Sequence, residues 1–186
     1  HAGDQQVCPD QYQPGFTGWG SFAQLVAIPH ADTNLVRLPE PLGFAEAASL
    51  GCRVITSFRG VVDQGRTRPG EWLAIHGCGG VGLAATMIGH ALGARMVCVD
   101  INPRKLTLAR SLGAEAVIDA SQQTDVVAAI QQLTGGGAQV SIDALGSPVT
   151  CRNSVRCLGR RGRHVQIGLT LGDHRDVSIP MNEVIA

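Results

Sequence analysis

A glycine-rich run near the middle of the chain has the residue types and spacing needed to hold a phosphate group. The run Gly77-Cys78-Gly79-Gly80-Val81-Gly82 follows a strand-like segment at 72–76 and leads into a helix-like segment at 83–92. In this setting the first glycine permits a tight turn, the second lets backbone approach a pyrophosphate, and the third lets helix pack on strand. The helix N-terminus adds free N–H groups for the anion. The pattern predicts a dinucleotide-binding loop, with a purely structural glycine turn as the alternative.

A carboxylate lies where such a site needs one for the adenosine ribose. The next strand-like run, 96–99, ends in Asp100, whose carboxylate can accept hydrogen bonds from two neighbouring ribose hydroxyls. Its charge would repel the 2′-phosphate of NADP, so we expect NAD. Lys105 could reach the same ribose, while Arg104 leaves NADP as an alternative because an arginine can neutralise a phosphate. Asp100 could instead be a surface acid that caps the following helix.

The segments that must position these residues alternate between strand and helix patterns. Strand-like runs fall at 72–76, 95–100, 116–118, 139–144 and 163–168, and helical patterns fall at 80–92, 103–112, 123–133 and 148–159. This alternation predicts an α/β fold, a doubly wound parallel sheet of the Rossmann type with helices on both faces. Ligands of such sheets bind outside the carboxyl ends of the strands. We therefore also place five strand-end residues beside the cofactor: Ala144, Leu145, Ile167, Gly168 and Leu169.

The first seventy residues follow a different pattern. Segments 21–28 and 34–38 are strand-like, and 44–62 is a long helical stretch interrupted around Gly51-Cys52. We place a domain boundary at this interruption. A partial, β-rich domain then occupies residues 1–53, and the dinucleotide-binding domain occupies 54–186.

The composition excludes several classes of partner. Fifteen basic and fifteen acidic residues cancel, and the densest basic run, Arg160 to Arg163, has the pattern of a solvated turn. We therefore expect no nucleic-acid or membrane partner. No apolar run approaches the roughly 20 residues of a membrane span and no signal peptide opens the chain, which favours a cytoplasmic location. The six cysteines form no CxxC pair, which favours reduced thiols or isolated metal ligands.

Five segments together resemble the zinc-dependent alcohol dehydrogenases of the medium-chain dehydrogenase/reductase family, over essentially the whole chain. They are Ala48 to Cys52, Gly70-Glu71-Trp72, the glycine run, Asp100 with Lys105, and Ser111 to Ala114. The resemblance implies an oxidoreductase that moves a hydride between an alcohol or aldehyde and NAD, with a catalytic zinc in the full-length enzyme. It also implies that residues 1–53 are a remnant of the family's GroES-like catalytic domain, and that the full-length form is a homo-oligomer.

The resemblance assigns roles to single residues. Cys52 matches the third protein ligand of the catalytic zinc, and Cys8 matches the last of four cysteines in the structural zinc lobe. Thr56 matches a residue that packs on the nicotinamide ring, and Val81 matches one that backs it. A catalytic zinc takes three protein ligands and keeps one position open for the alcohol oxygen. Without such partners, Cys52 is better interpreted as a small buried thiol.

Parts of the family pattern have no counterpart in this chain. No second cysteine or His-Glu pair precedes Cys52 at the family's positions, and the proton-relay residues belong to the same region. The chain begins with His1 and ends at Ala186, before the family's last sheet strand. We therefore expect a cofactor-binding fragment that is inactive alone, and we assign no catalytic residue. Fold does not identify the alcohol or aldehyde.

Other interpretations stay open. A stand-alone dinucleotide-binding module without catalysis would explain the missing ligands, but the two family cysteines argue against it. A zinc-free quinone reductase of the same superfamily is the nearest rival enzyme, and Cys52 disfavours it. An S-adenosylmethionine methyltransferase also has a glycine loop and an acidic strand end, but the loop spacing disfavours it. His76, His90 and His164 have no second ligand at metal spacing, so we interpret them as structural.

Overall fold

The computed structural model describes residues 5–185 of the chain. The chain divides between Gly43 and Phe44 into two compact units. The boundary expected from the sequence, 53/54, falls later than this division, inside the helical segment that begins the second unit. The assignment of residues 1–53 to a catalytic-domain remnant stays a prediction.

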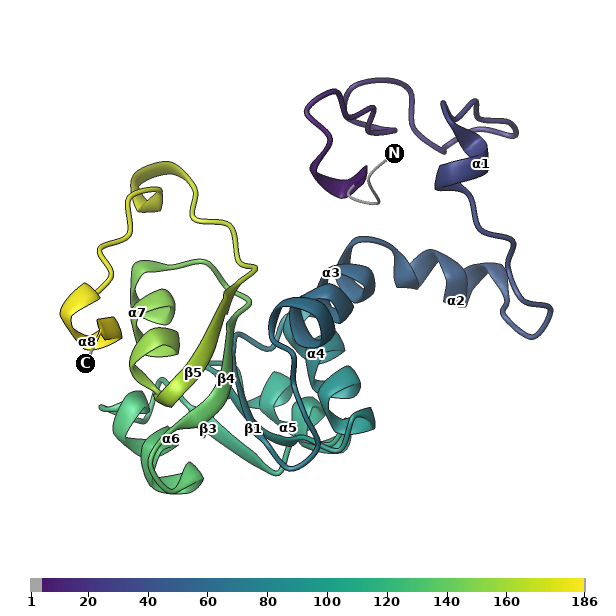
Figure 1. Ribbon diagram of the computed structural model, residues 1–186. Coiled ribbons are helices and arrows are strands. Elements are labelled where there is room, and N and C mark those ends of the chain that lie inside the picture. The colour runs from purple at the N-terminus through teal and green to yellow at the C-terminus, as the bar shows by residue number, and fades with distance from the viewer. Residues whose placement is uncertain (1–4, 186) are drawn as a thin grey trace. The chain divides into compact units, whose positions relative to one another are not determined.

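The second unit is built on one five-stranded parallel sheet (Figure 1). Its strands are β1 (Trp72–His76), β2 (Arg95–Asp100), β3 (Ala116–Asp119), β4 (Ala138–Asp143) and β5 (Leu158–Gln166). The spatial order is β3-β2-β1-β4-β5, and every neighbouring pair is parallel. The predicted doubly wound sheet is therefore confirmed. Ligands of open α/β sheets bind where the strand order reverses, which here is between the carboxyl ends of β1 and β4.

Four helices connect these strands: α4 (Gly80–Ala91), α5 (Pro103–Ser111), α6 (Val126–Thr134) and α7 (Pro148–Arg156). Asn102, Asp125 and Ser147 cap α5, α6 and α7, each accepting a hydrogen bond from a backbone N–H of the first turn. The N-cap of α4 is Gly79, which has no side chain to do this. The first N–H groups of α4 thus lack the side-chain acceptor that the other three helices have.

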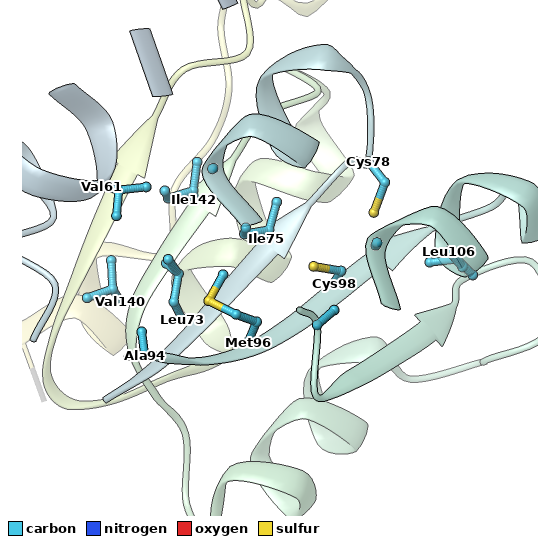
Figure 2. Packing of buried hydrophobic residues seen from close by; sticks show 13 residues of the cluster. Val61, Leu73, Ile75, Cys78, Ala94, Met96, Cys98, Leu106, Val140 and Ile142 are labelled. Atoms are coloured by element: carbon cyan, nitrogen blue, oxygen red, sulfur yellow. The ribbon is translucent and has the colours of Figure 1, made fainter. Parts of the chain in front are cut away.

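Apolar side chains fill both faces of the sheet. Leu73 and Ile75 of β1 point to one face, where they pack with Met96, Val140 and Ile142 (Figure 2). Residues of α4, α5 and the segment before β1 complete this cluster. Burying one such leucine or isoleucine side chain contributes about 1.5–3 kcal/mol.

The opposite face of the sheet carries a second cluster. Trp72 and Ala74 alternate with the β1 residues of the first face and pack with Val97 and Ile130. Side chains of α6 and the residue that follows α7 cover this face. A sheet buried on both faces explains why its strands read as nearly continuous apolar runs.

The last strand differs from its predicted range. The sequence pattern extends a helix to 159 and starts the strand at 163, but α7 ends at Arg156 and β5 begins at Leu158. The pairing of β4 with β5 is irregular between Ala138 and Val140, because more residues lie on β5 than on β4 at this point. A bulge of this kind hides the strand pattern by interrupting the alternation of side chains.

A link of three glycines joins α6 to β4 at the amino edge of the sheet. Gly135, Gly136 and Gly137 all have positive φ, at 71°, 123° and 120°. A Cβ on Gly135 or Gly136 would meet no heavy atom within 4 Å. A Cβ on Gly137 would overlap the backbone of Gly159. All three positions favour glycine because φ is positive, and at Gly137 the close backbone of Gly159 also leaves no room for a side chain.

Short elements complete the second unit. They are α2 (Phe44–Ser49), the π-helical turns η2 (Leu50–Val54) and η3 (Arg59–Gln64), α3 (Ile55–Phe58), η4 (Gly172–His174) and α8 (Met181–Ile185). The backbone at Gly51 is not helical, at φ −54° and ψ −134°, so the predicted interruption around Gly51-Cys52 is confirmed. In the described residues no helix has the length and apolar character needed to cross a membrane.

The first unit does not contain the two strands that the sequence predicts. Its described elements are η1 (Gln5–Val7), α1 (Ala31–Asn34) and an isolated bridge between Pro14 and Gly18, so the prediction of strands at 21–28 and 34–38 is wrong. A strand is stable only when its backbone pairs with a neighbour, and within residues 5–43 neither segment has one. Apolar side chains such as Phe16 and Phe22 are consequently exposed.

Candidate dinucleotide-binding site

The glycine loop makes the turn from β1 to α4 that its sequence predicts. Gly77 has φ +99°, a conformation that L side chains rarely adopt, and its N–H donates to Val99 O at 2.8 Å. A Cβ on Gly77 would lie 3.2 Å from Leu145 Cβ. A Cβ on Gly82 would overlap the Gly77 carbonyl oxygen. The first and third glycines are thus required by the turn and by the close packing of α4.

The middle of the loop faces open space. A Cβ on Gly79 would meet no heavy atom within 4 Å, although this residue begins a helix packed on the sheet. The start of α4 has no side-chain cap. Free N–H groups at a helix N-terminus bind anions through hydrogen bonds and the helix dipole. This arrangement fits a pyrophosphate placed against the loop.

One cationic side chain that the sequence analysis missed lies against the loop. A Cβ on Gly80 would overlap the Arg53 side chain, with Nε at 2.9 Å. Arg53 belongs to η2, and none of the ion pairs among residues 5–185 involves it. A guanidinium beside the positive end of a helix is electrostatically unfavourable unless an anion joins them. In the sequence, the one indication that Arg53 lies near the site was its position directly after Cys52.

Asp100 ties the loop to the end of β2. Its Oδ2 accepts a hydrogen bond from Cys78 N at 2.8 Å, and its Oδ1 accepts one from Asn102 N at 2.9 Å. Lys105 Nζ lies 3.8 Å from the same Oδ2, and the Asp100 side chain is only 8% exposed. A carboxylate has about four acceptor positions, so two remain for ribose hydroxyls. The structure therefore brings Asp100 and Lys105 to the loop, as the sequence predicts.

The loops after β4 and β5 meet beside Gly77. A Cβ on Gly168 would overlap the backbone of Gly146, and one on Gly146 would overlap the backbone of Leu169. Leu145 is 60% exposed next to them. The predicted residues Ala144, Leu145, Ile167, Gly168 and Leu169 are thus gathered at the carboxyl edge of the sheet.

Asp143 holds these two loops together, and the sequence analysis did not identify it. This buried residue ends β4. Its Oδ1 accepts from Leu145 N at 2.9 Å and Gly146 N at 3.1 Å, and its Oδ2 accepts from Gln166 Nε2 at 2.9 Å. An acidic residue at the end of a buried strand was the signal. Ile101, which follows Asp100 and is 69% exposed, is a second residue at this edge that was not predicted.

The residues expected near the nicotinamide are linked through Ser57. Its Oγ lies 2.8 Å from Val81 O and 2.7 Å from Arg53 O, so its one O–H donates to either carbonyl and joins α3 to the first turn of α4. Thr56 precedes Ser57 in α3 and is half-buried. The structure thus places Thr56 and Val81 in neighbouring segments, and their contact with a nicotinamide stays a prediction.

The two predicted zinc ligands lie in different compact units. Cys8 belongs to the first unit and Cys52 to the second, and both are exposed, so the interpretation of Cys52 as a small buried thiol is wrong. In residues 5–185 no three His, Cys, Asp or Glu side chains form a group that could hold a metal ion. A catalytic zinc needs three protein ligands. The described residues therefore do not fit a zinc site by themselves.

The remaining four cysteines are buried. Cys78 in the glycine loop points inward, toward Cys98 of β2 (Figure 2). Its hydrogen bond with the Cys98 thiol and its burial raise the pKa of Cys78. A protonated, enclosed thiol is unreactive, so Cys78 acts as a packing residue of the loop.

A series of hydrogen-bonded polar side chains lies below the carboxyl edge of the sheet, on the face that α7 covers. His76 Nε2 lies 3.5 Å from Cys157 Sγ, whose thiol donates to Ser141 Oγ at 3.4 Å. Ser141 Oγ lies 2.7 Å from Ser154 Oγ, and Ser154 Oγ lies 2.9 Å from His164 Nδ1. His164 is thus held by structural contacts, and the structural interpretation of this histidine is consistent with its position.

His76 is the least satisfied member of this series. It is 1% exposed, and its Nδ1 has no hydrogen-bond partner among the described residues. Burial lowers the pKa of His76 to about 4, against the opposing field of Asp143, while nearby His164 lowers it further. The ring is therefore neutral at pH 7. A buried polar atom without a partner costs about 1–3 kcal/mol.

Comparisons with known proteins agree with this architecture. Residues 80–186 match the family described as "Zinc-binding dehydrogenase". Over 171 residues the chain is 35% identical to an alcohol dehydrogenase of Rhizobium meliloti (strain 1021), which covers 91% of this chain and 48% of that protein. The chain spans about half the length of the curated relatives it matches.

Solved structures of similar proteins align with nearly the whole chain. The alcohol dehydrogenase of the archaeon Aeropyrum pernix aligns with a TM-score of 0.83 at 32% identity, covering 97% of this chain and 52% of that one. A protein described as an NAD-dependent alcohol dehydrogenase aligns with a TM-score of 0.84 at 28% identity, covering 97% and 51%. These alignments support the Rossmann-type fold and extend the similarity to the first unit.

Proposed function

This chain belongs to the zinc-binding dehydrogenase family, and we propose that it is the NAD-binding portion of an alcohol dehydrogenase. The observation that carries the proposal is the hydrogen bond from Cys78 N to Asp100 Oδ2. It joins the phosphate loop to the acid that a ribose needs, so both halves of a dinucleotide site form one unit. Relatives that are alcohol dehydrogenases support an oxidoreductase.

The residues of the chain bind and orient the cofactor in this proposal. NAD, when bound, supplies the hydride acceptor. N–H groups at Gly79 and Gly80 hold the pyrophosphate, and Asp100 accepts hydrogen bonds from the ribose hydroxyls with Lys105 beside it. The loops after β4 and β5 exclude water from the cofactor at the carboxyl edge of the sheet. The negative charge of Asp100 favours NAD over NADP.

The zinc chemistry belongs to the longer enzyme, if Cys52 and Cys8 keep their family roles. We propose each of them as a single ligand, Cys52 of a catalytic zinc and Cys8 of a structural zinc. In the same proposal residues 1–53 are part of a catalytic domain and 54–186 are the cofactor domain of a cytoplasmic homo-oligomer. The substrate is a small alcohol or aldehyde.

A second candidate is a dinucleotide-binding module without catalysis. The absence of a three-ligand metal group in residues 5–185 favours it for this chain. Both candidates bind NAD and differ in turnover. An assay of the purified chain with NAD, zinc and a panel of alcohols separates them. Turnover with stoichiometric zinc would exclude the non-catalytic module. It would also show that the chain is active by itself.

Cofactor choice tests the proposal. Titration of the chain with NADH and NADPH should give at least tenfold tighter binding of NADH, because a 2′-phosphate would lie beside Asp100. Asp100→Asn should shrink this preference by about tenfold, since it removes the charge and keeps an acceptor. Asp119→Asn is the matched control, because Asp119 is the register partner of Asp100 at the end of β3. Equal affinities for NADH and NADPH in the unmutated chain would contradict the NAD assignment.

A further inference from the structure

The carboxyl ends of β4 and β5 are joined by the side chain of Gln166, the last residue of β5. Its Nε2 donates to Asp143 Oδ2 at 2.9 Å and to Gly168 O at 2.8 Å. The first bond reaches the neighbouring strand, and the second reaches the loop that follows β5 (Figure 1). One amide group therefore connects the ends of two parallel strands.

Asp143 makes this connection a fixed point for both loops. Its carboxylate is fully buried and also accepts hydrogen bonds from Leu145 N and Gly146 N, in the loop after β4. Its backbone oxygen accepts from Gly168 N at 2.8 Å, in the loop after β5. Gly168 is thus held at its N–H by Asp143 and at its carbonyl by Gln166. Without the Gln166 amide, Gly168 would keep only the first of these bonds, and a buried Asp143 oxygen would lose its partner.

The orientation of the Gln166 amide is determined by its partners. Asp143 Oδ2 and Gly168 O are both acceptors, so they face the amino group, and Oε1 is left to face His164 Nε2 at 3.2 Å. The neutral His164 ring therefore carries its proton on Nε2, and its Nδ1 accepts from Ser154 Oγ at 2.9 Å. A flipped amide would place its oxygen against two acceptors. The polar side chains below the carboxyl edge thus hold this amide in one orientation.

These loops lie on the nicotinamide side of the proposed dinucleotide site, and the inference rests on that site. Asp100, the residue proposed for the adenosine ribose, ends β2, and the phosphate loop follows β1. The strand order β3-β2-β1-β4-β5 then places the second half of the dinucleotide at the ends of β4 and β5. The loop after β4 also packs against the phosphate loop, since a Cβ on Gly77 would lie 3.2 Å from Leu145 Cβ.

We propose that Gln166 is a positioning residue that shapes the nicotinamide half of the site by holding the loops after β4 and β5 in one arrangement. A ligand that must order a loop on binding loses affinity. The contacts of Gln166 order these two loops before the cofactor arrives. Its contribution therefore appears as affinity for the nicotinamide half of the dinucleotide, and the adenosine half, held by the glycine loop and Asp100, does not depend on it.

The test compares NADH with ADP-ribose, which lacks the nicotinamide, by calorimetric titration of the full chain. Gln166→Met keeps the length of the side chain and removes both donors. We expect NADH to bind about tenfold more weakly to this variant and ADP-ribose to bind as it does to the unmutated chain. Gln166 is exposed, so the substitution disturbs no core packing. A fraction of unfolded chain would weaken both ligands by the same factor, so the ratio of the two dissociation constants separates positioning from folding.

Gln166→Glu is a second variant that keeps the shape of the side chain. Its carboxylate would face Asp143 and the carbonyl of Gly168, which are both acceptors, so NADH should bind more weakly than to Gln166→Met. The double variant Asp143→Asn/Gln166→Glu restores a donor and an acceptor between the two positions. It should recover part of the NADH affinity that Gln166→Glu loses, and a double variant that binds NADH no better than Gln166→Glu would overturn the inference.

Gln139→Met is the matched control, because Gln139 also joins two strands through its side chain, but at the amino edge of the sheet. Its Oε1 accepts a hydrogen bond from Trp72 N at 2.8 Å. This substitution should lower the melting temperature and leave the ratio of the NADH and ADP-ribose dissociation constants unchanged.

The outcomes separate the inference from the proposed function. Equal loss of NADH and ADP-ribose affinity in Gln166→Met, or an unchanged NADH affinity, would overturn the inference and leave the NAD site intact. The same change of ratio in Gln139→Met would also overturn it, because the effect would then not depend on the carboxyl edge. Failure of the unmutated chain to bind NADH would overturn both proposals.

Discussion

Lowering the pH from 7 to 5 should destabilise the second unit, and replacing His76 by phenylalanine should remove most of that effect. His76 is enclosed by Cys157, which follows α7, with Asp143 of β4 and His164 of β5 as the nearest titrating groups. Burial lowers the pKa of its imidazole from 6.5 to about 4. The unfolded chain therefore binds a proton between these values that the folded chain rejects.

The sign and size of the effect follow from this difference. Stability rises with pH wherever the unfolded state holds more protons. The contribution of His76 is thus complete above pH 6.5, is lost as the pH falls toward about 4, and changes no further below that. The whole difference corresponds to about 3 kcal/mol, of which about 2 kcal/mol is lost by pH 5. The lowered pKa of His164 adds a change of the same direction.

Urea unfolding followed by tryptophan fluorescence measures the effect. Trp72 is buried at the start of β1 and reports on the sheet, while exposed Trp19 is replaced by phenylalanine in every protein compared. Between pH 7 and pH 5 the free energy of unfolding should fall by about 2 kcal/mol less in His76→Phe than in its parent. Equal decreases in the two proteins would refute the argument that His76 is buried in its neutral form.

Two further substitutions separate packing from binding in the glycine loop. Gly82→Ala should lower the free energy of unfolding by about 1–3 kcal/mol, seen as a lower melting temperature, because the new Cβ would overlap the Gly77 carbonyl. The same substitution should weaken NADH binding. Gly79→Ala should weaken binding at least tenfold with an unchanged melting temperature, because its Cβ enters open space where the pyrophosphate approaches. Arg53→Gln should weaken NADH binding about tenfold and reduce the salt dependence of binding. Arg59→Gln should change neither quantity, because the Arg59 guanidinium already pairs with Asp63 in the unmutated chain. Equal salt dependence in both arginine variants would contradict the role of Arg53.

The parts of the fold that could be predicted are those whose signals are local. The glycine loop, Asp100 and the first three strands are each specified by a few consecutive residues, and the structure has them at nearly the predicted positions. The roles that we propose for the loop and for Asp100 rest on the same short patterns. The sheet order follows in turn, because strands joined by helices form parallel pairs in a doubly wound fold.

The missed features depend on contacts between distant segments. Arg53 reaches Gly80 because η2 and α3 both pack on α4, and the position of Arg53 in the sequence does not reveal that packing. The partners of His76 come from β4, β5 and the end of α7, so its unpartnered nitrogen emerges only in the folded chain. Residues 21–28 have the alternation of a strand, but alternation does not supply the neighbour that a strand needs.

The link from α6 to β4 offers a place to remodel the chain away from the carboxyl edge of the sheet, where we propose that the cofactor binds. Gly135 and Gly136 have open space around them, and they lie at the amino edge of the sheet, opposite the carboxyl ends where the loops gather. New chain ends made there by circular permutation, or a reporter domain inserted between these two residues, would leave the order of the strands unchanged. Gly137 has to remain, because it abuts Gly159. The sheet thus lies between the link where we expect insertions to be tolerated and the edge where we propose that the cofactor binds.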